Sequence, residues 1–180
     1  MNKGLVSGLV LLALGLLCGV LLAGVNSFTA PIIKDLEDQV KYTALAEFYT
    51  LSDYSIDEVF VTDNNIIDTI FVLKDKTSGE VLAAVYSVKS YGYQSNVKLL
   101  IAVEKDLSIK GYKVVEQGET AGLGSQSVTF SFMATGVGTD ITDISGFDSI
   151  SGSTITSNAV HRCFNEVSTF VSSYGLGGVN

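Results

Sequence analysis

Residues 66–88 of this chain read IIDTIFVLKDKTSGEVLAAVYSV, and this stretch decides the class of the fold. Two apolar runs rich in Val, Ile and Leu, at 66–73 and 81–88, are typical of β-strands. The polar residues between them, at 75–79, read DKTSG, which is typical of a tight turn. We therefore predict two neighbouring strands joined as an antiparallel hairpin.

Three further segments extend the pattern on both sides of this hairpin. They lie at 59–61, 97–103 and 109–115 and are rich in Val, Ile and Tyr. A second turn-like stretch, Asp63-Asn64-Asn65, separates the first of them from the hairpin. Because no helical pattern falls between the strands, we predict an α+β domain with a mainly antiparallel sheet.

The carboxyl-terminal region predicts loops followed by a helix. Residues 118–152 are rich in Gly and small hydroxyl residues, which is typical of loops. Ser157 and Asn158 then precede an apolar stripe and are candidate helix caps. The glycine-rich end, 175–180, is expected to be a flexible tail. The stripe recurs at helical spacing and consists of Ala159, Val160, Phe164, Val167, Phe170 and Val171.

At the amino-terminal end, residues 4–25 form a run of 22 residues without a charge. As a helix this run spans about 33 Å, enough to cross a hydrocarbon layer about 30 Å thick. A cleaved signal peptide has a shorter apolar core and ends in small residues, a pattern that this run lacks. We therefore predict a retained transmembrane anchor over 4–25, a helical stalk over 26–50, and one domain over 51–174.

The part that follows the anchor is acidic. The chain has a formal charge of −8, and Lys3 is the only charged residue before Asn26, so residues 26–180 carry −9. This balance argues against a nucleic-acid partner, because phosphate binding needs a basic surface. With the short amino-terminal tail kept in the cytoplasm, we expect a single-pass protein of the cell membrane, in contact with lipid, whose domain lies on the extracytoplasmic side.

The sequence contains no pattern typical of a metal site or of nucleophilic catalysis. Its one histidine, His161, falls four residues after Ser157, but no G-x-S-x-G motif is present. Cys18 and Cys163 lack the spacing of metal ligands and are interpreted as small apolar residues. We therefore expect no metal and no catalytic residues.

One hydroxyl-rich segment, residues 148–158, reads DSISGSTITSN. Its composition alone predicts a polar loop that caps the last helix. Its order, however, resembles the flavinylation motif Asp-x-x-[Ser/Thr]-Gly-[Ala/Ser]-[Ser/Thr]-x-[Ser/Thr] of the FMN-binding domain family. In that family the last hydroxyl is esterified to the phosphate of FMN, which implies attachment at Thr156, or at Thr154 if the register slips. The residues that fit the motif are Asp148, Ser151, Gly152, Ser153, Thr154 and Thr156.

Two other segments share the resemblance. Residues 119–124 read ETAGLG and resemble a Glu-Thr-Pro-Gly-Leu-Gly loop that lies against the flavin in the family, although an ordinary glycine turn is the alternative. Gly92-Tyr93 resembles a third landmark. The resemblance implies that Leu123 packs on the flavin ring and that Glu119 and Thr120 shape its polar edge. The cofactor contacts implied in this loop are Glu119, Thr120, Gly122, Leu123 and Gly124.

With one anchor, 180 residues and these landmarks in order, the chain resembles the G subunits of Rnf complexes, which couple ferredoxin and NAD redox chemistry to ion transport. The resemblance implies an electron carrier with covalent FMN, partnered by other membrane and peripheral subunits and loaded by a flavin transferase. The C subunits of Na⁺-translocating NADH:quinone reductases share the motif and are usually longer. Two other interpretations remain, a stand-alone extracellular flavoprotein and a pilin-like structural protein, although residues 4–25 lack the glutamate of pilin helices.

Overall fold

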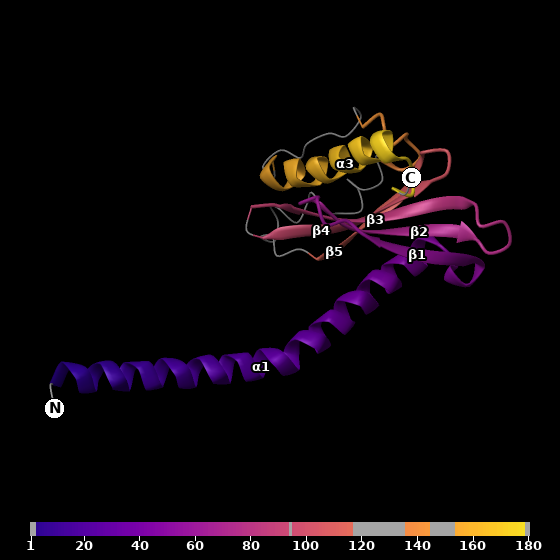
Figure 1. Ribbon diagram of the computed structural model, residues 1–180. Helices are drawn as coiled ribbons and strands as arrows, with labels where there is room; N and C mark the ends of the chain where they lie inside the picture. The colour runs from indigo at the N-terminus through magenta and orange to yellow at the C-terminus, as the bar shows by residue number, and fades with distance from the viewer. Residues whose placement is uncertain (1–2, 94, 117–135, 145–153, 179–180) are drawn as a thin grey trace. The chain divides into compact units, whose positions relative to one another are not determined.

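The computed structural model describes residues 3–93, 95–116, 136–144 and 154–178 (Figure 1). The chain divides into two compact units, residues 1–40 and 41–180. In chain order the elements are helix α1 (Lys3–Phe48), the 3₁₀ turn η1 (Leu51–Asp53), strands β1 (Tyr54–Phe60), β2 (Ile67–Asp75), β3 (Val81–Tyr91), β4 (Asn96–Glu104) and β5 (Ile109–Glu116), and helix α3 (Thr154–Tyr174).

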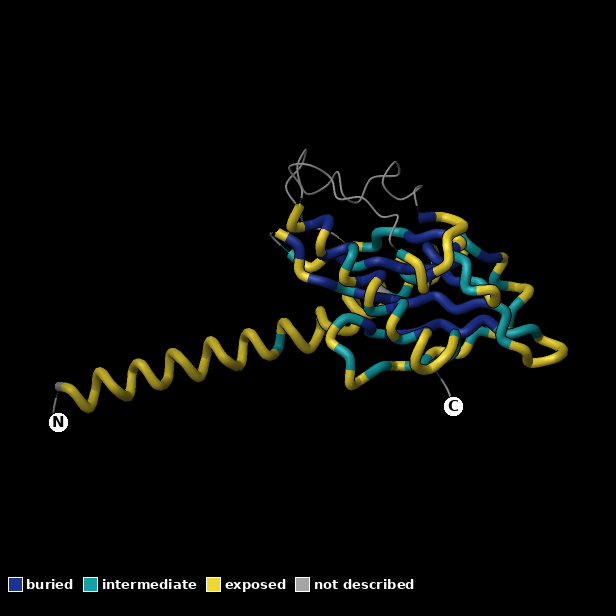
Figure 2. Tube along the Cα trace, turned by 90° about the horizontal axis from the view of Figure 1, so that it is seen from above, coloured by how far each residue is buried: buried dark blue, intermediate teal, exposed yellow. Residues whose placement is uncertain are grey.

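The first unit consists of the apolar part of α1. Its leucines are exposed, with Leu11 and Leu22 each 72% accessible, and Figure 2 shows this exposure along the helix. Among the described residues, α1 is the one helix whose length and composition suit a membrane span, with a mean hydropathy of 2.7 over its most apolar 18 residues. Residues 4–33 of this helix carry no charge and are mostly exposed, as suits a helix in a hydrocarbon layer, which supports the predicted anchor.

The second unit is built on a five-stranded antiparallel sheet with the strand order β1-β2-β3-β4-β5. Val85 on the central strand β3 pairs with Phe71 on one side and with Ala102 on the other. The β2–β3 connection is the turn expected from its composition, because the carboxylate of Asp75 accepts hydrogen bonds from the backbone N–H groups of Thr77 (2.8 Å) and Ser78 (2.7 Å). The predicted α+β class with an antiparallel sheet is confirmed.

Both faces of the sheet are covered, which explains the nearly continuous apolar runs of β2, β3 and β4. The last turns of α1 pack on one face, where Ala44 and Leu45 are buried against Phe71 and Val85. Gly111 leaves room for this packing, because a Cβ at that position would lie 3.0 Å from the ring of Phe48. Helix α3 packs on the opposite face (Figure 1).

Strand β1 begins at Tyr54, five residues before the predicted segment at 59–61. It is an edge strand whose partly buried side chains lie on both faces of the sheet. Ile56 packs toward α1, whereas Val59 packs toward the α3 side. Because the partly buried Ile56 and Val59 are three residues apart and the apolar Phe60 is exposed, the strand lacks the regular apolar alternation that marks a half-buried strand.

The expected caps of the last helix were wrong. Helix α3 begins at Thr154, so Ser157 and Asn158 lie within its first turns and do not cap it. Hydroxyl residues are weak helix formers, and here tertiary burial overrides that preference, since Ser157 is 0% exposed.

Residues 175–178 make contacts with the domain, and the flexible tail expected over 175–180 stays a prediction. Gly175 ends α3 in the left-handed conformation (φ 75°), and its N–H donates to the carbonyl of Val171 at 2.9 Å. The hydroxyl of Tyr86 donates to the carbonyl of Leu176, whose side chain packs against the core. The glycines here permit a tight turn, so their abundance does not indicate mobility.

Candidate functional site

The structure describes two residues of the proposed flavinylation motif, Thr154 and Thr156, both in the first turn of α3. The other motif residues, Asp148, Ser151, Gly152 and Ser153, lie outside the described residues. So does the whole glycine-rich segment, with the predicted contacts Glu119, Thr120, Gly122, Leu123 and Gly124.

The first half of α3 is held firmly on the sheet. Val160, Cys163 and Phe164 are at most 1% exposed and belong to the core that faces this helix. The ring of Phe164 meets the ring of Tyr112 on β5 edge to face, with centroids 4.8 Å apart. This packing confirms the apolar stripe and sets the rotation of α3, which decides which hydroxyl of the first turn faces inward.

The two candidate attachment residues differ in exposure because of that rotation. Thr156 lies on the inward face and is 1% exposed, whereas Thr154 is exposed. Residues two positions apart on a helix point in different directions. A phosphoester at Thr156 would therefore be shielded from water, and one at Thr154 would stand at the surface.

The charge at this end of α3 suits a phosphate. The first turn of the helix contains no acidic residue, and Arg162 precedes the first acid of α3, Glu166. The first four N–H groups of a helix have no partner within the helix and carry its positive partial charge. A hydroxyl nucleophile beside such N–H groups is the chemistry that a phosphate ester needs, so the described residues fit the phosphate of FMN.

Arg162 links α3 to the β3–β4 hairpin. Its Nε donates to the hydroxyl of Ser90 at 3.0 Å, and its terminal N–H donates to the carbonyl of Tyr91 at 2.7 Å. These bonds place the predicted landmark Gly92-Tyr93 next to the first half of α3. Sequence reasoning missed Arg162, although it is the only arginine of the chain and follows Thr156 by six residues.

The cysteine in α3 does not offer a second attachment point. Burial raises the pKa of the Cys163 thiol to about 12, so at neutral pH it is protonated and weakly nucleophilic. Cys163 packs in the core among apolar side chains, which confirms its interpretation as a small apolar residue.

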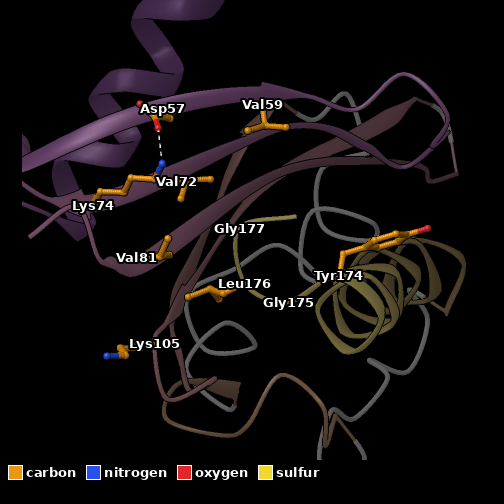
Figure 3. Close-up of a pocket in the computed structure, with 11 residues that line it drawn as sticks. Asp57, Val59, Val72, Lys74, Val81, Lys105, Tyr174, Gly175, Leu176 and Gly177 are labelled. Carbon is orange, nitrogen blue, oxygen red and sulfur yellow. Dashed lines mark hydrogen bonds and ion pairs between the residues drawn. The ribbon is translucent and has the colours of Figure 1, made fainter. Parts of the chain in front are cut away.

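A hollow of about 500 Å³ lies at the opposite, carboxyl-terminal end of α3 (Figure 3). We call it the C-terminal hollow. Its wall is formed by apolar residues of β1, β2 and β3, by Tyr174 and the turn that follows it, and by Lys74 and Lys105. Lys74 is paired with Asp57 at 2.7 Å, as the dashed line in Figure 3 shows. At 1.5 Å per residue, Tyr174 stands about 27 Å along α3 from Thr156, so the hollow is separate from the proposed site.

Residues 92–168 match the family of FMN-binding domains. The match begins at the hairpin landmark Gly92-Tyr93 and extends through the first fifteen residues of α3, so it includes Thr156 and Arg162.

The chain is similar to two curated G subunits. The first is the G subunit of the proton-translocating ferredoxin:NAD(+) oxidoreductase complex of Clostridium ljungdahlii, 24% identical over 88% of this chain and 86% of the relative. The second is the G subunit of the ion-translocating oxidoreductase complex of Methanosarcina acetivorans, 33% identical over 53% of this chain and 55% of the relative. The chain thus matches about half the length of the second relative. The resemblance to the G subunits is confirmed.

Among solved structures, the crystal structure of Shewanella oneidensis NqrC is similar, with 24% identity, a TM-score of 0.45, and coverage of 63% of this chain and 62% of that chain.

Proposed function

We propose that this chain is a membrane-anchored electron carrier that holds FMN covalently and relays electrons within an Rnf-type ferredoxin:NAD oxidoreductase complex coupled to ion translocation. The match of residues 92–168 to the FMN-binding domains carries the proposal. The apolar helix α1 and the names of the two relatives support the anchor and the complex.

The FMN phosphate is proposed to be esterified to Oγ1 of Thr156. Transfer from FAD balances as follows: the threonine oxygen bonds to the phosphorus next to the riboflavin, the pyrophosphate bond breaks, AMP leaves, and the hydroxyl loses its proton. We assign recognition by the flavin transferase to the motif around this threonine. The flavin then supplies the redox chemistry, and the chain supplies its position and electrostatic surroundings. The recognition residues are Asp148, Ser151, Gly152, Ser153 and Thr154.

The ring contacts are proposed to come from the glycine-rich segment at 119–124. Leu123 would pack on the ring, with Glu119 and Thr120 at its polar edge and Gly122 and Gly124 allowing close approach. A covalent bond suits a domain on the extracytoplasmic side, where free FMN is scarce. A noncovalent site there would lose its cofactor whenever the free concentration fell below the dissociation constant.

The burial of Thr156 bears on when the flavin is attached. Thr156, a residue that is 1% exposed, must become accessible before a transferase can act on its hydroxyl. The end of a helix is the part that opens at the lowest free energy, so the transferase is expected to act when the first turn of α3 is open. Closure of that turn then protects the ester from water.

The test is to produce the full chain with and without a flavin transferase and to look for flavin fluorescence in a denaturing gel. We expect a fluorescent band only with the transferase, and a mass increase equal to FMN less one water. Thr156→Ala should abolish the band, and the matched control Thr169→Ala, at an exposed position of the same helix outside the motif, should retain it. If the band survives in Thr156→Ala and disappears in Thr154→Ala, the attachment site is Thr154. If the band survives in both variants, both assignments are wrong.

The side of the membrane is tested separately. Protease added to intact cells from which the outer barrier has been removed should digest residues 51–174 if the domain is extracytoplasmic, as we propose. Protection of the domain until the membrane is broken would contradict this orientation.

A further inference from the structure

The C-terminal hollow has walls that are mainly apolar and come from several elements of the domain. Val59 of β1, Val72 of β2 and Val81 of β3 contribute side chains from the sheet, and Leu176 contributes one from the turn after α3 (Figure 3). Its volume is about 500 Å³. A concave site of this size, with apolar walls and a few polar groups, suits a small organic molecule.

Gly177 leaves this hollow open. A Cβ at this position would lie 3.6 Å from Val72 and 4.0 Å from Val81, which is ordinary contact, and the φ of Gly177 lies outside the left-handed region. The backbone therefore accepts other residues here, and a side chain would fill the hollow. Gly79 and Gly175 in the same wall differ, because their φ values of 70° and 75° favour glycine. The fold could cover this apolar surface and leaves it accessible to a guest molecule.

The charge of the wall is opposite to that of the domain. Lys74 and Lys105 line the hollow, and Asp57 is the one acid among the described residues that line it. Lys74 pairs with Asp57 at 2.7 Å, whereas Lys105 pairs with Glu80, which is not part of the wall. Residues 26–180 carry −9, so two ammonium groups beside one carboxylate reverse the local sign.

These ion pairs can give way to a guest anion. The side chains of Lys105 and Glu80 are 59% and 55% exposed, and an exposed ion pair of this kind contributes little stability. Replacing the carboxylate of Glu80 by that of a guest therefore costs little. A guest whose apolar part is enclosed by the wall would gain the burial of that part in addition.

The end of α3 does not offset this preference for an anion. Carbonyl groups at the end of a helix attract cations when they have no partner. Here the carbonyl of Val171 accepts from the N–H of Gly175 at 2.9 Å, and the carbonyl of Gly175 accepts from the N–H of Gly178 at 3.3 Å. The carbonyl of Leu176 accepts from the hydroxyl of Tyr86.

We propose that the C-terminal hollow binds a small organic carboxylate with an apolar body. The apolar body lies against Val72, Val81 and Leu176, and the carboxylate lies among the ammonium groups of Lys74 and Lys105. No residue of the hollow belongs to the flavinylation motif or to the glycine-rich segment at 119–124. This proposal and the proposed flavin attachment therefore fail separately.

The test titrates the full chain, in nanodiscs of phosphatidylcholine, with 4-phenylbutyrate and follows the methyl NMR signals of Val59, Val72 and Val81. We expect saturable shifts of these three signals. The neutral analogue 4-phenylbutanamide should bind about fivefold more weakly, because it cannot pair with the ammonium groups. Acetate, which lacks the apolar body, should give no saturable shift.

Two kinds of variant locate the site. Gly177→Leu should fill the hollow and weaken binding at least about tenfold without lowering the melting temperature, and Gly177→Ala should have a smaller effect. Lys74→Gln with Lys105→Gln should weaken binding of 4-phenylbutyrate about fivefold. The lysines of the matched control pair with acids away from the hollow, and the control should bind normally. That control is Lys89→Gln with Lys98→Gln, which removes the same charge.

Three results would overturn the proposal. Equal affinity for the acid and the amide would reject recognition of an anion, and unchanged binding in Gly177→Leu would reject the location. Shifts of the valine signals that do not saturate would reject a defined site. If Gly177→Leu does not fold, equal binding by the two double lysine variants rejects the location. Thr156→Ala should lose the flavin and bind 4-phenylbutyrate as the unchanged chain does.

Discussion

At its amino-terminal end α3 holds a buried hydroxyl, Thr156, whereas at its carboxyl-terminal end it borders the open C-terminal hollow of about 500 Å³. Concave surfaces of this size are the usual candidates for ligand-binding sites. The FMN-binding match nevertheless covers the first end and stops at residue 168, before Tyr174. The covalent bond that we propose would not rely on the binding free energy of a deep pocket, so under this proposal the size of a hollow does not identify the cofactor site.

The largest expected effect concerns the packing that orients the amino-terminal end. Phe164→Ala should lower the free energy of unfolding by about 3–5 kcal/mol, because it removes a buried ring and its contact with Tyr112. Chemical denaturation of the domain measures this. The matched control is Phe60→Ala on the edge strand, where the ring is 70% exposed and the change should stay within about 0.5 kcal/mol. Equal losses in the two variants would mean that α3 is not anchored as described.

The next effect concerns the turn at the carboxyl-terminal end. Gly178→Ala should cost about 2 kcal/mol, because φ is 62° and the new Cβ would lie 2.7 Å from the ring of Phe170. Gly175→Ala has a similar φ of 75° but open space around the Cβ, so about 1 kcal/mol is expected. Thermal unfolding measures the loss of stability in the two variants, and the difference between them reports the clash with Phe170. If Gly178→Ala leaves the melting temperature unchanged, the end of the chain is mobile, as the sequence predicts.

A smaller effect is expected at Arg162. Arg162→Ala removes two hydrogen bonds to the β3–β4 hairpin and should cost about 1 kcal/mol, since the side chain is partly solvated. Amide hydrogen exchange should become faster in the tip of the hairpin and stay unchanged in the β2–β3 turn at the other end of the sheet. Arg162→Lys, which keeps the charge and loses the forked geometry, should recover only part of the protection.

The smallest effect is pH-dependent and belongs to the β2–β3 turn beside the C-terminal hollow. Hydrogen bonds from Ser78 and Thr77 hold the pKa of Asp75 below its usual value of 3.8. A carboxylate with a lowered pKa stabilises the fold above its unfolded pKa and loses this effect as the pH falls through its folded pKa.

Asp75→Asn keeps an acceptor and removes the charge. Wild type should therefore melt slightly higher than Asp75→Asn at pH 7, and the difference should shrink below about pH 4. Melting curves at the two pH values test this, and a difference that grows in acid would contradict the assigned direction.

The parts of the fold that were predicted correctly are those in which local pattern and burial agree. The stripe through Phe164 and Val167 has helical spacing because one side of α3 packs on the sheet. The apolar runs at 66–73 and 81–88 indicated strands, and the turn at Asp75 joined them. In these segments the residues that form the element also form the core.

The predictions that failed concern residues whose environment is set by distant partners. The start of α3 at Thr154 and the start of β1 at Tyr54 carry no apolar periodicity of their own. The closeness of Gly178 to the ring of Phe170 was not predicted, because Phe170 belongs to α3. Arg162 was overlooked, because its partners Ser90 and Tyr91 lie more than seventy positions away in the sequence.

The sequence by itself determined the long apolar helix and the antiparallel sheet, since these depend on hydrophobic period over short stretches, and its residue order is the basis for proposing attachment at Thr156. Only the tertiary structure decided that Thr156 is enclosed while Thr154 is exposed, and that Arg162 ties α3 to the hairpin. The rotation of a helix on a sheet depends on how side chains from several strands interlock, and no local pattern contains that information.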